Sequence, residues 1–296
     1  MKKNGLINTL FLRCTSEWLA FGCALFPQHI LKIAFLLLPL LLGSQNTEAS
    51  VGLRIVSLAP DLTEIVYALG LEDSLVGVSD YSDFPEAAHT KPSVGSFIAP
   101  SLEKILLLHP TVVLVQSDAT PSHITHAIQA QKISLLSFKA RHENDIYETL
   151  KTVGQKFRKE KKALALITQM KKTFLTLQKP LKKHSVLIQI EETPVMVAGE
   201  NTLLHRAIIL AGGKNAAQKY LGYPKLQREV LLKLNPDMVI LPQTQGQEEK
   251  IRSMKNHWEK NKIPVTVIPS ELLTRATPRF CEGVQKLASS LSRLPK

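Results

Sequence analysis

A short pattern occurs twice in this chain, 126 residues apart. In residues 103–114 a glutamate is followed after six residues by a proline and then by an apolar pair, and residues 229–241 repeat this order. Each copy predicts a short amphipathic helix with an exposed glutamate, then a break and an apolar strand. The spacing is too long for a solenoid or propeller. It predicts two similar lobes with a cleft between them.

Strand-like and helix-like segments alternate around both copies. Residues 54–59 and 75–78 have the composition of buried strands, and between them lies an amphipathic segment that Gly70 ends. Such alternation predicts an α/β fold with parallel sheets, whose ligands bind outside the carboxyl ends of the strands. We therefore expect an N-terminal α/β lobe over 50–143 and a C-terminal α/β lobe over 181–296.

The segment between the lobes has helical spacing. Apolar residues recur with this spacing from about Asn144 to Lys179, ahead of Pro180. At ~1.5 Å per residue a single helix of this length would span on the order of 50 Å. We expect one long α-helix over 144–180 that joins the lobes as a stiff spar and restricts closure of the cleft to small motions.

Residues 1–49 have the features of an export signal. The apolar run 33–42 follows a lysine and is shorter than the ~20 residues of a membrane span. Thr47 and Ala49 approximate the small-x-small pattern before a cleavage site. The surroundings of Cys23 fit a lipoprotein signal poorly. We expect a periplasmic protein whose signal peptide is cleaved near Ala49 and which carries no lipid anchor.

Composition and motifs argue against several function classes. The net charge is +12, but no nucleic-acid-binding motif accompanies the basic cluster at 156–172, so a solvated helix face is expected and nucleic acid is not a predicted partner. Cys281 is the only cysteine after the leader, which excludes an internal disulfide there. His123 and His126 lie three apart without a third ligand nearby, so no metal site is predicted. Catalytic motifs are absent, and no enzyme is predicted.

Several segments together resemble the metal-chelate substrate-binding proteins of ABC importers, over residues 52–294. The segments that carry the resemblance are Arg54-Ile-Val-Ser-Leu-Ala-Pro60, Thr63-Glu64, Ala68-Leu69-Gly70, Val78-Ser-Asp-Tyr-Ser-Asp-Phe-Pro85, Arg228-Glu229, Trp258, Lys262-Ile-Pro-Val265 and Arg275-Ala-Thr-Pro-Arg279. Each block is modest, but their order and spacing are jointly specific to the members that bind corrinoids such as vitamin B12. The resemblance implies two Rossmann-like lobes joined by one long helix, and a monomer.

The resemblance also suggests a role for the repeated glutamates. In the family, paired glutamates resembling Glu103 and Glu229 meet arginines of the membrane permease, which works with an ATPase. The alternative is helix capping, because a glutamate in a first turn also complements the helix dipole. The permease and its ATPase are therefore the expected protein partners.

Aromatic positions of the cleft carry over with substitutions. Tyr81 matches an aromatic residue of the corrinoid-binding members. Phe97 and Tyr223 stand where those members resemble one another in having tryptophans, and Gln116 replaces a further aromatic residue. Flat macrocycles are held mostly by burial and aromatic contact, which Phe and Tyr provide with less area than Trp.

Two polar residues complete the implied ligand site. Glu271 and Arg275 resemble polar cleft residues that can hydrogen-bond the amide side chains of a corrin. The expected ligand is cobalamin or a related corrinoid, transported and not kept as a cofactor. Haem is the alternative if Tyr81 or Tyr223 serves as an axial ligand, and a ferric siderophore is the alternative if Arg275 meets its acidic groups.

Overall fold

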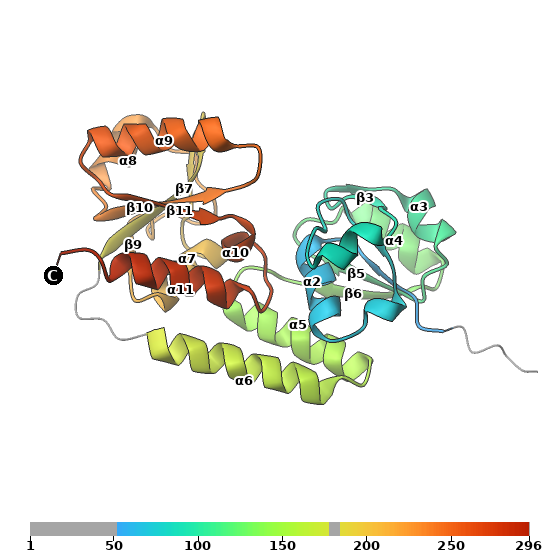
Figure 1. Cartoon of the computed structure of the whole chain (residues 1–296). Coiled ribbons are helices and arrows are strands. Elements are labelled where there is room, and N and C mark those ends of the chain that lie inside the picture. The colour runs from blue at the N-terminus through green and yellow to red at the C-terminus, as the bar shows by residue number, and fades with distance from the viewer. Residues whose placement is uncertain (1–51, 178–183, 296) are drawn as a thin grey trace, which may run out of the picture. The chain divides into compact units, whose positions relative to one another are not determined.

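The computed structural model describes residues 52–177 and 184–295 (Figure 1). The expected signal peptide and its cleavage site near Ala49 lie outside these residues. From Gly52 onward the chain forms one compact unit. This unit contains two main β-sheets, one in residues 52–142, here called lobe 1, and one in residues 184–295, called lobe 2. The predicted α/β fold with parallel sheets is confirmed.

Lobe 1 has a four-stranded parallel sheet with the order β2-β1-β5-β6. Its strands are β1 (Ile55–Ser57), β2 (Leu75–Val78), β5 (Val112–Gln116) and β6 (Ser134–Phe138). Its helices are α2 (Pro60–Ala68), α3 (Leu102–Leu107) and α4 (Ser122–Ala130), with short 3-10 turns η1 (Glu72–Ser74) and η2 (Glu86–Thr90) and a small hairpin of β3 (Gly95–Ser96) and β4 (Ala99–Pro100). The sequence predicted the four sheet strands but not the small hairpin.

Lobe 2 has a five-stranded sheet with the order β11-β10-β7-β8, in which β9 also pairs with β7. Only β8 runs antiparallel. The strands are β7 (Ser185–Glu192), β8 (Val195–Val197), β9 (Lys214–Asn215), β10 (Met238–Gln243) and β11 (Val265–Pro269). The helices are α7 (Leu203–Leu210), α8 (Arg228–Lys233), α9 (Glu248–Lys260), α10 (Glu271–Thr274) and α11 (Phe280–Leu291).

The sequence repeat corresponds to matching hydrophobic cores. In each lobe two helices cover one face of the sheet, and their buried residues recur 126 residues apart in the first helix and strand and 130 apart in the second helix. The matching pairs are Ile105 and Leu231, Val113 and Val239, Val115 and Leu241, Ile124 and Met254, and Ile128 and Trp258. The repeat therefore extends beyond the pattern that the sequence made visible.

The backbone repeats as well. His109 (φ 44°) and Asn235 (φ 39°) adopt left-handed conformations at the break before the proline in the two copies. Lys132 (φ 60°) and Lys262 (φ 59°) do the same after the second helix of each lobe. Non-glycine residues adopt this region rarely. Shared use of it at matching turns indicates that the two lobes are copies of one structural unit.

The expectation of one continuous helix over 144–180 is wrong. The structure has two helices, α5 (Glu143–Lys156) and α6 (Glu160–Leu177), which pack against each other (Figure 1). Arg158 lies in the left-handed region (φ 57°), which reverses the chain. A Cβ atom on Gly154 would come within 2.7 Å of the Ala163 side chain, so small residues let the helices approach closely. The last residues of the expected helix lie outside the described segments.

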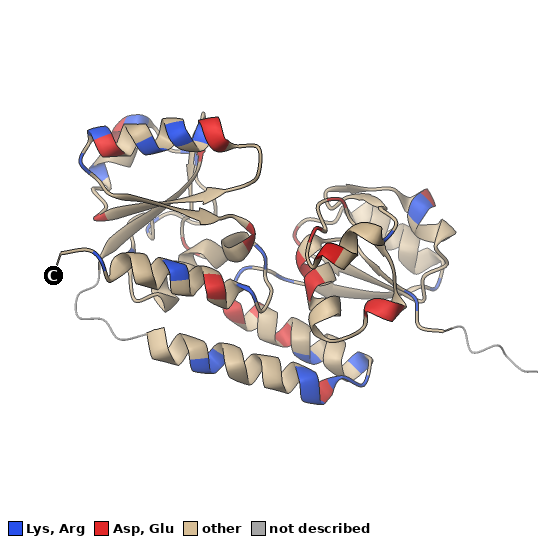
Figure 2. Cartoon of the chain, viewed as in Figure 1, with Lys and Arg blue, Asp and Glu red and all other residues tan. Residues whose placement is uncertain are grey.

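The helix pair shares a core with both lobes. One cluster of buried residues contains Ile65 and Leu114 of lobe 1, Leu150 of α5, and Ile208 and Phe280 of lobe 2. A shared close-packed core resists deformation, which agrees with the expectation of small closure motions. Lys and Arg residues of α5 and α6 lie on the outer surface (Figure 2). Within the described residues, no helix is both long and apolar enough to cross a membrane.

Candidate ligand-binding site

The strand order of lobe 1 defines where a ligand would bind. The chain leaves β1 toward β2 on one side of the sheet, and β5 toward β6 on the other side. The adjacent carboxyl ends of β1 and β5 therefore form the topological switch point, where α/β sheets bind ligands. Asp61 follows β1 in the first turn of α2, and Gln116 is the last residue of β5.

Asp61 and Gln116 are hydrogen-bonded to each other at this switch point. The Nε2 atom of Gln116 donates to Oδ2 of Asp61, and the Leu62 amide donates to Oδ1 at 2.9 Å. The Asp61 residue is only 4% exposed. Burial raises the pKa of Asp61 to about 6, although both hydrogen bonds lower it. A buried carboxyl group with a perturbed pKa at a switch point marks a candidate functional site.

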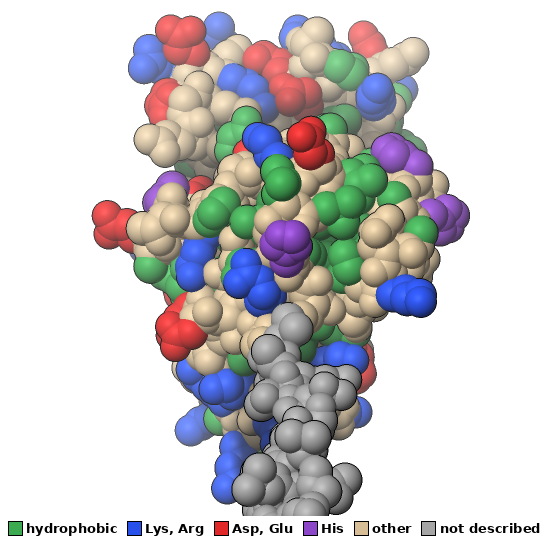
Figure 3. All heavy atoms as spheres, turned by 90° about the vertical axis from the view of Figure 1, so that its right-hand side faces the viewer, with side chains coloured by type: hydrophobic (Ala, Val, Ile, Leu, Met, Phe, Trp, Pro, Cys, Tyr) green, Lys and Arg blue, Asp and Glu red, His purple; other side chains and the backbone are tan. Residues whose placement is uncertain are grey.

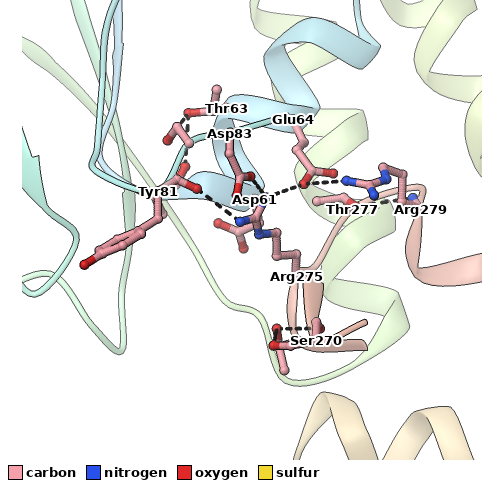
Figure 4. Close-up of polar contacts among 12 residues, drawn as sticks. Asp61, Thr63, Glu64, Tyr81, Asp83, Ser270, Arg275, Thr277 and Arg279 are labelled. Carbon is pink, nitrogen blue, oxygen red and sulfur yellow. Dashed lines mark hydrogen bonds and ion pairs between the residues drawn. The ribbon is translucent and has the colours of Figure 1, made fainter. Parts of the chain in front are cut away.

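A chain of buried hydroxyl groups fixes the loop that follows β2. The Thr63 hydroxyl donates to Ser57 Oγ at 2.9 Å and lies 3.1 Å from Ser82 Oγ, which in turn lies 3.1 Å from Ser79 Oγ. The loop holds Tyr81 in a left-handed conformation (φ 63°). Its ring projects away from the neighbouring polar cluster (Figure 4) and its residue is 76% exposed. The hydroxyl network thus presents an aromatic ring to solvent from a rigid base.

Four charged residues join the two lobes, and we call them the interlobe ion-pair cluster: Glu64 and Asp83 of lobe 1, and Arg275 and Arg279 of lobe 2. Arg275 Nη1 lies 2.9 Å from Glu64 Oε1 and 2.6 Å from Asp83 Oδ1, and Arg279 Nη1 lies 3.3 Å from Glu64 Oε1 (Figure 4). The Arg279 guanidinium also lies 3.7 Å from the centroid of the Phe84 ring. The cluster closes the space between α2 and the loop before α11.

The charge states in this cluster depend on burial. The Glu64 side chain is 3% exposed, and burial raises its pKa while the two arginines offset part of the shift. Burial also acts on Asp83, but Arg275 outweighs it and lowers the Asp83 pKa. Glu64 Oε2 is buried without a hydrogen-bond partner among the described residues. Arg275 is consequently already engaged by protein carboxylates.

A second set of contacts links the start of α5 to lobe 2. His142 Nε2 and Asn201 Oδ1 are 2.9 Å apart. Arg206 donates to both oxygens of Glu143, at 2.8 and 2.6 Å. Burial alone would raise the Glu143 pKa, yet the bidentate arginine with its added hydrogen bonds lowers it. These contacts hold the connection between the lobes in one geometry.

The predicted aromatic residues are on loops and open to solvent. Phe97 is in the turn between β3 and β4 and is 37% exposed, while Tyr223 is 50% exposed. Tyr223 follows Gly222, whose carbonyl accepts the Gly199 amide at 2.8 Å. A Cβ atom on Gly199 would meet the Tyr220 carbonyl oxygen at 2.2 Å, so glycine is required for this loop to approach. Partial burial raises the Tyr223 pKa.

The polar residues predicted for the ligand site have different settings. Arg275 belongs to the interlobe cluster, Gln116 is bonded to Asp61, and Glu271 begins α10 and is half-buried. Sequence reasoning did not select Asp61 or Glu64, although Glu64 lies in a quoted motif. A buried acid three residues after another on one helix was the available signal. Nothing in the sequence linked Asp61 to a glutamine 55 positions later.

The remaining predicted chemistry is peripheral. His123 and His126 are exposed on α4, and several histidines are visible on the outer face of lobe 1 (Figure 3). Across the described segments, no group of three or more His, Cys, Asp or Glu residues is arranged to hold a metal. Cys281 is partly buried, and burial raises its pKa to about 12, so its thiol stays protonated.

Glu103 and Glu229 occupy matching surfaces. Both are exposed in the first turns of α3 and α8, two residues before the buried Ile105 and Leu231. Neither forms an ion pair with another described residue. The Ser101 side chain already caps α3 by accepting the Lys104 amide. Helix capping in α3 therefore does not depend on Glu103.

Comparison with known proteins identifies the family. The family model described as periplasmic binding protein matches residues 55–266. The chain is 31% identical over 253 residues to an ABC transporter substrate-binding lipoprotein, YvrC, of Bacillus subtilis, covering 80% of this chain and 79% of the relative. The chain belongs to the periplasmic binding protein family of ABC transporter substrate-binding proteins. Because YvrC is named a lipoprotein, the expected absence of a lipid anchor gains no support.

Other relatives and structures agree on the family and the fold. A vitamin B12-binding protein of Yersinia pseudotuberculosis is 27% identical over 276 residues, covering 92% of this chain and 96% of that protein. The B12-binding protein BtuF of Vibrio cholerae superposes with a TM-score of 0.71 at 24% identity, covering 81% and 96% of the two chains. The heme-binding protein RhuT of Roseiflexus gives 0.72 at 24% identity, covering 80% and 97%. At these identities the structural matches support the fold alone.

Proposed function

We propose that this protein is the periplasmic substrate-binding component of an ABC importer and that it carries cobalamin or a related corrinoid to the permease. The observation that carries the proposal is the set of exposed aromatic side chains on loops of both lobes, Tyr81 and Phe97 on one and Tyr223 on the other. They fit the faces of a flat macrocycle, which gains most of its binding energy from burial. Relatives named vitamin B12-binding protein support this ligand.

The polar residues of the site favour a ligand without carboxylates. Arg275 is bound by Glu64 and Asp83, so little of its positive charge is free for an acidic ligand. Glu271 adds an acceptor at the start of α10. Amide side chains, which can donate hydrogen bonds, suit such surroundings better than the carboxylates of haem or of many siderophores.

The haem alternative has a chemical cost at the tyrosines. A tyrosine that binds ferric iron does so as the phenolate, and burial raises the pKa of Tyr223. Tyr81 is 76% exposed and has a single-residue left-handed backbone, which holds its ring outward. Haem therefore remains the rival ligand that any binding experiment has to include.

The delivery step involves the matched surfaces of α3 and α8. Glu103 and Glu229 would meet basic residues of the permease, whose ATPase drives release, while the carrier acts as a monomer. The two glutamates project from equivalent positions of two copies of one unit, as a two-fold related partner requires. No catalytic role is proposed for either residue.

The test is calorimetric titration of protein purified from cells that express the full chain. We expect one-to-one binding of cyanocobalamin, with weaker or no binding of haemin and of a ferric siderophore. Tyr81→Ala and Tyr223→Ala should weaken cobalamin binding, whereas Leu164→Ala, at an exposed leucine of α6 that is 65% exposed, serves as the matched control. Tight haemin binding without cobalamin binding would overturn the corrinoid assignment.

A further inference from the structure

Gln116 presents two different ends of one amide at the switch point of lobe 1. A glutamine side chain carries an NH2 group that donates two hydrogen bonds and a carbonyl oxygen that accepts them. Which end faces a ligand decides whether the ligand must offer acceptors or donors. Gln116 ends the central strand β5 next to α2, where a ligand of this fold class would lie.

Asp61 determines the orientation of this amide. An ionised carboxylate can only accept hydrogen bonds. One oxygen of Asp61 accepts the Leu62 amide at 2.9 Å, and the other accepts Nε2 of Gln116. If the glutamine were turned over, its carbonyl oxygen would face a carboxylate oxygen, which is repulsive. The Gln116 NH2 group is therefore committed to Asp61.

The carbonyl end of Gln116 is left available. No hydrogen bond from any described residue reaches Oε1 of Gln116. This oxygen is also absent from the buried side-chain atoms that lack a partner, which in the described segments are Glu64 Oε2 and His257 Nε2. Oε1 is thus an acceptor that solvent or a ligand can reach.

Gln189 of lobe 2 shows what a purely structural glutamine has in the same molecule. Its Oε1 accepts the indole Nε1–H of Trp258 at 2.7 Å, and its Nε2 donates to the Glu191 carbonyl oxygen at 3.1 Å. Both ends are used inside the protein, and the residue is 3% exposed. Gln116 differs because only one of its ends is used.

We propose that Asp61 is a positioning residue that turns the Gln116 carbonyl oxygen toward the ligand, so that the site selects a macrocycle bearing side-chain amides over the same macrocycle bearing carboxylates. The inference deepens the proposed function and rests on it. The amide N–H of the ligand donates to Gln116 Oε1. A ligand carboxylate has no proton to donate there, and the negative charge of Asp61 opposes it.

The surrounding charges support the same preference. Glu64 is the charged group that raises the pKa of Asp61 by its negative charge, and no cation is in contact with either Asp61 or Gln116 among the described residues. The nearest arginine of the interlobe cluster, Arg275, is bound to Glu64 and Asp83. A buried acid without a cation costs stability, which is consistent with retention of Asp61 for binding.

The test compares matched ligand pairs. One pair is cyanocobalamin and its singly hydrolysed derivatives, in which one amide has become a carboxylate, and the other pair is haemin and its bis-amide. The proteins are the full chain, Asp61→Asn, Gln116→Met, and Asp73→Asn as a control at an exposed aspartate of η1. The measurement is the ratio of the two dissociation constants within each pair.

We expect the unmodified protein to prefer the amide of at least one pair by about tenfold or more, because a carboxylate leaves the polar groups unmatched. Asp61→Asn can donate to Gln116 Oε1 and release the NH2 group, so the ratio should fall toward one while the amide form still binds. Gln116→Met should also reduce the ratio, and Asp73→Asn should not change it.

The outcomes separate the two proposals. An unchanged ratio in Asp61→Asn and Gln116→Met, with amide binding retained, overturns the positioning role and leaves the cobalamin function standing. Binding of the haem pair alone overturns the cobalamin function, and the ratio within that pair then decides the role of Asp61. Absence of binding to all four ligands overturns both. If Asp61→Asn does not fold, the Gln116→Met ratio decides.

Discussion

The two lobes are alike on the side away from the ligand site and different at the site itself. Their outer cores use matching positions, such as Ile105 and Leu231. At the site, β1 of lobe 1 continues directly into α2, whereas β7 of lobe 2 turns into the antiparallel strand β8 before α7 begins. A duplicated unit has thus kept its supporting half and changed its ligand-facing half.

The charges at the lobe junction differ in sign as well. Lobe 1 contributes the acids Glu64 and Asp83, and lobe 2 contributes Arg275 and Arg279. A symmetric pair of lobes would bring like charges together, which is unfavourable in a buried setting. The divergence of the two copies therefore allows the lobes to be joined by ion pairs as well as by the shared core.

The largest predicted effect tests the equivalence of the outer cores. Trp258 and Ile128 are both fully buried at matching positions, but only Trp258 has a polar partner, Gln189. Trp258→Ala should lower the free energy of unfolding by about 3–5 kcal/mol and Ile128→Ala by about 2–5 kcal/mol. Trp258→Ala should lie toward the upper end, since it leaves Gln189 Oε1 without its donor.

Urea unfolding measures these changes. Leu164→Ala at an exposed position is the control and should change the free energy by less than about 0.5 kcal/mol. A smaller loss for Trp258→Ala than for Ile128→Ala would show that the two outer cores do not carry equivalent loads and would break the comparison between lobes.

The second prediction concerns Asp61, which has no counterpart in lobe 2. Its pKa is raised from 3.8 to about 6 in the folded protein. The folded state then binds a proton more tightly than the unfolded state, so stability is highest below about pH 4 for this group and falls as pH rises toward 6. The full shift corresponds to about 3 kcal/mol at neutral pH.

Asp61→Asn should therefore stabilise the protein at pH 7, by up to about 3 kcal/mol, and have little effect at pH 4. Unfolding measured at several pH values between 4 and 7 checks this, with Asp73→Asn, an exposed aspartate, as control. A destabilised Asp61→Asn at pH 7 would mean that its hydrogen bonds outweigh the cost of its burial.

Sequence reasoning reached the elements and missed what depends on long-range contact. The strand 75–78 was predicted at the bounds that β2 has, because a β-branched apolar run between turn residues is a local signal. The break between α5 and α6 was missed because Phe157 and the residues after it preserve an apparently helical pattern. The missing apolar positions between 157 and 164 were the available sign of that break.

The candidate site was predictable only in part. Tyr81, Phe97 and Tyr223 could be selected because aromatic residues in loops are visible in a sequence. The pairing of Asp61 with Gln116 depends on β1 and β5 lying side by side, and the capture of Arg275 by Glu64 joins residues 211 positions apart. Contacts of this kind arise from tertiary packing and leave no local pattern.

The third prediction compares the aromatic contributions of the lobes to ligand binding. Tyr81→Ala and Tyr223→Ala each remove one aromatic contact with the macrocycle, worth about 0.5–1.5 kcal/mol. Cobalamin affinity should fall about two- to twelvefold for each variant, and by about the product of these for the double variant if the rings act on separate faces. Calorimetry of the single and double variants measures this, and loss in only one lobe would show an asymmetric site.

The smallest predicted effects concern Glu103 and Glu229, where the lobes should behave alike. Each exposed ion pair with a permease arginine is worth about 0.2–1 kcal/mol. Glu103→Gln and Glu229→Gln should each weaken binding to the permease up to about fivefold, with equal losses, and the double variant should lose more than either. Ligand affinity and unfolding should not change, because both glutamates lie on exposed first turns without ion pairs to other described residues.

The salt dependence of permease binding distinguishes docking from helix capping. A docking charge affects the association rate and makes it sensitive to ionic strength, so the double variant should lose most of that sensitivity. A capping role predicts instead a small loss of stability in each variant with permease binding unchanged. Ser101, which already caps α3, makes this second result less expected for Glu103 than for Glu229, whose helix α8 has no side-chain cap. Unequal effects of that kind would show that the duplication preserved the glutamates for different reasons in the two lobes.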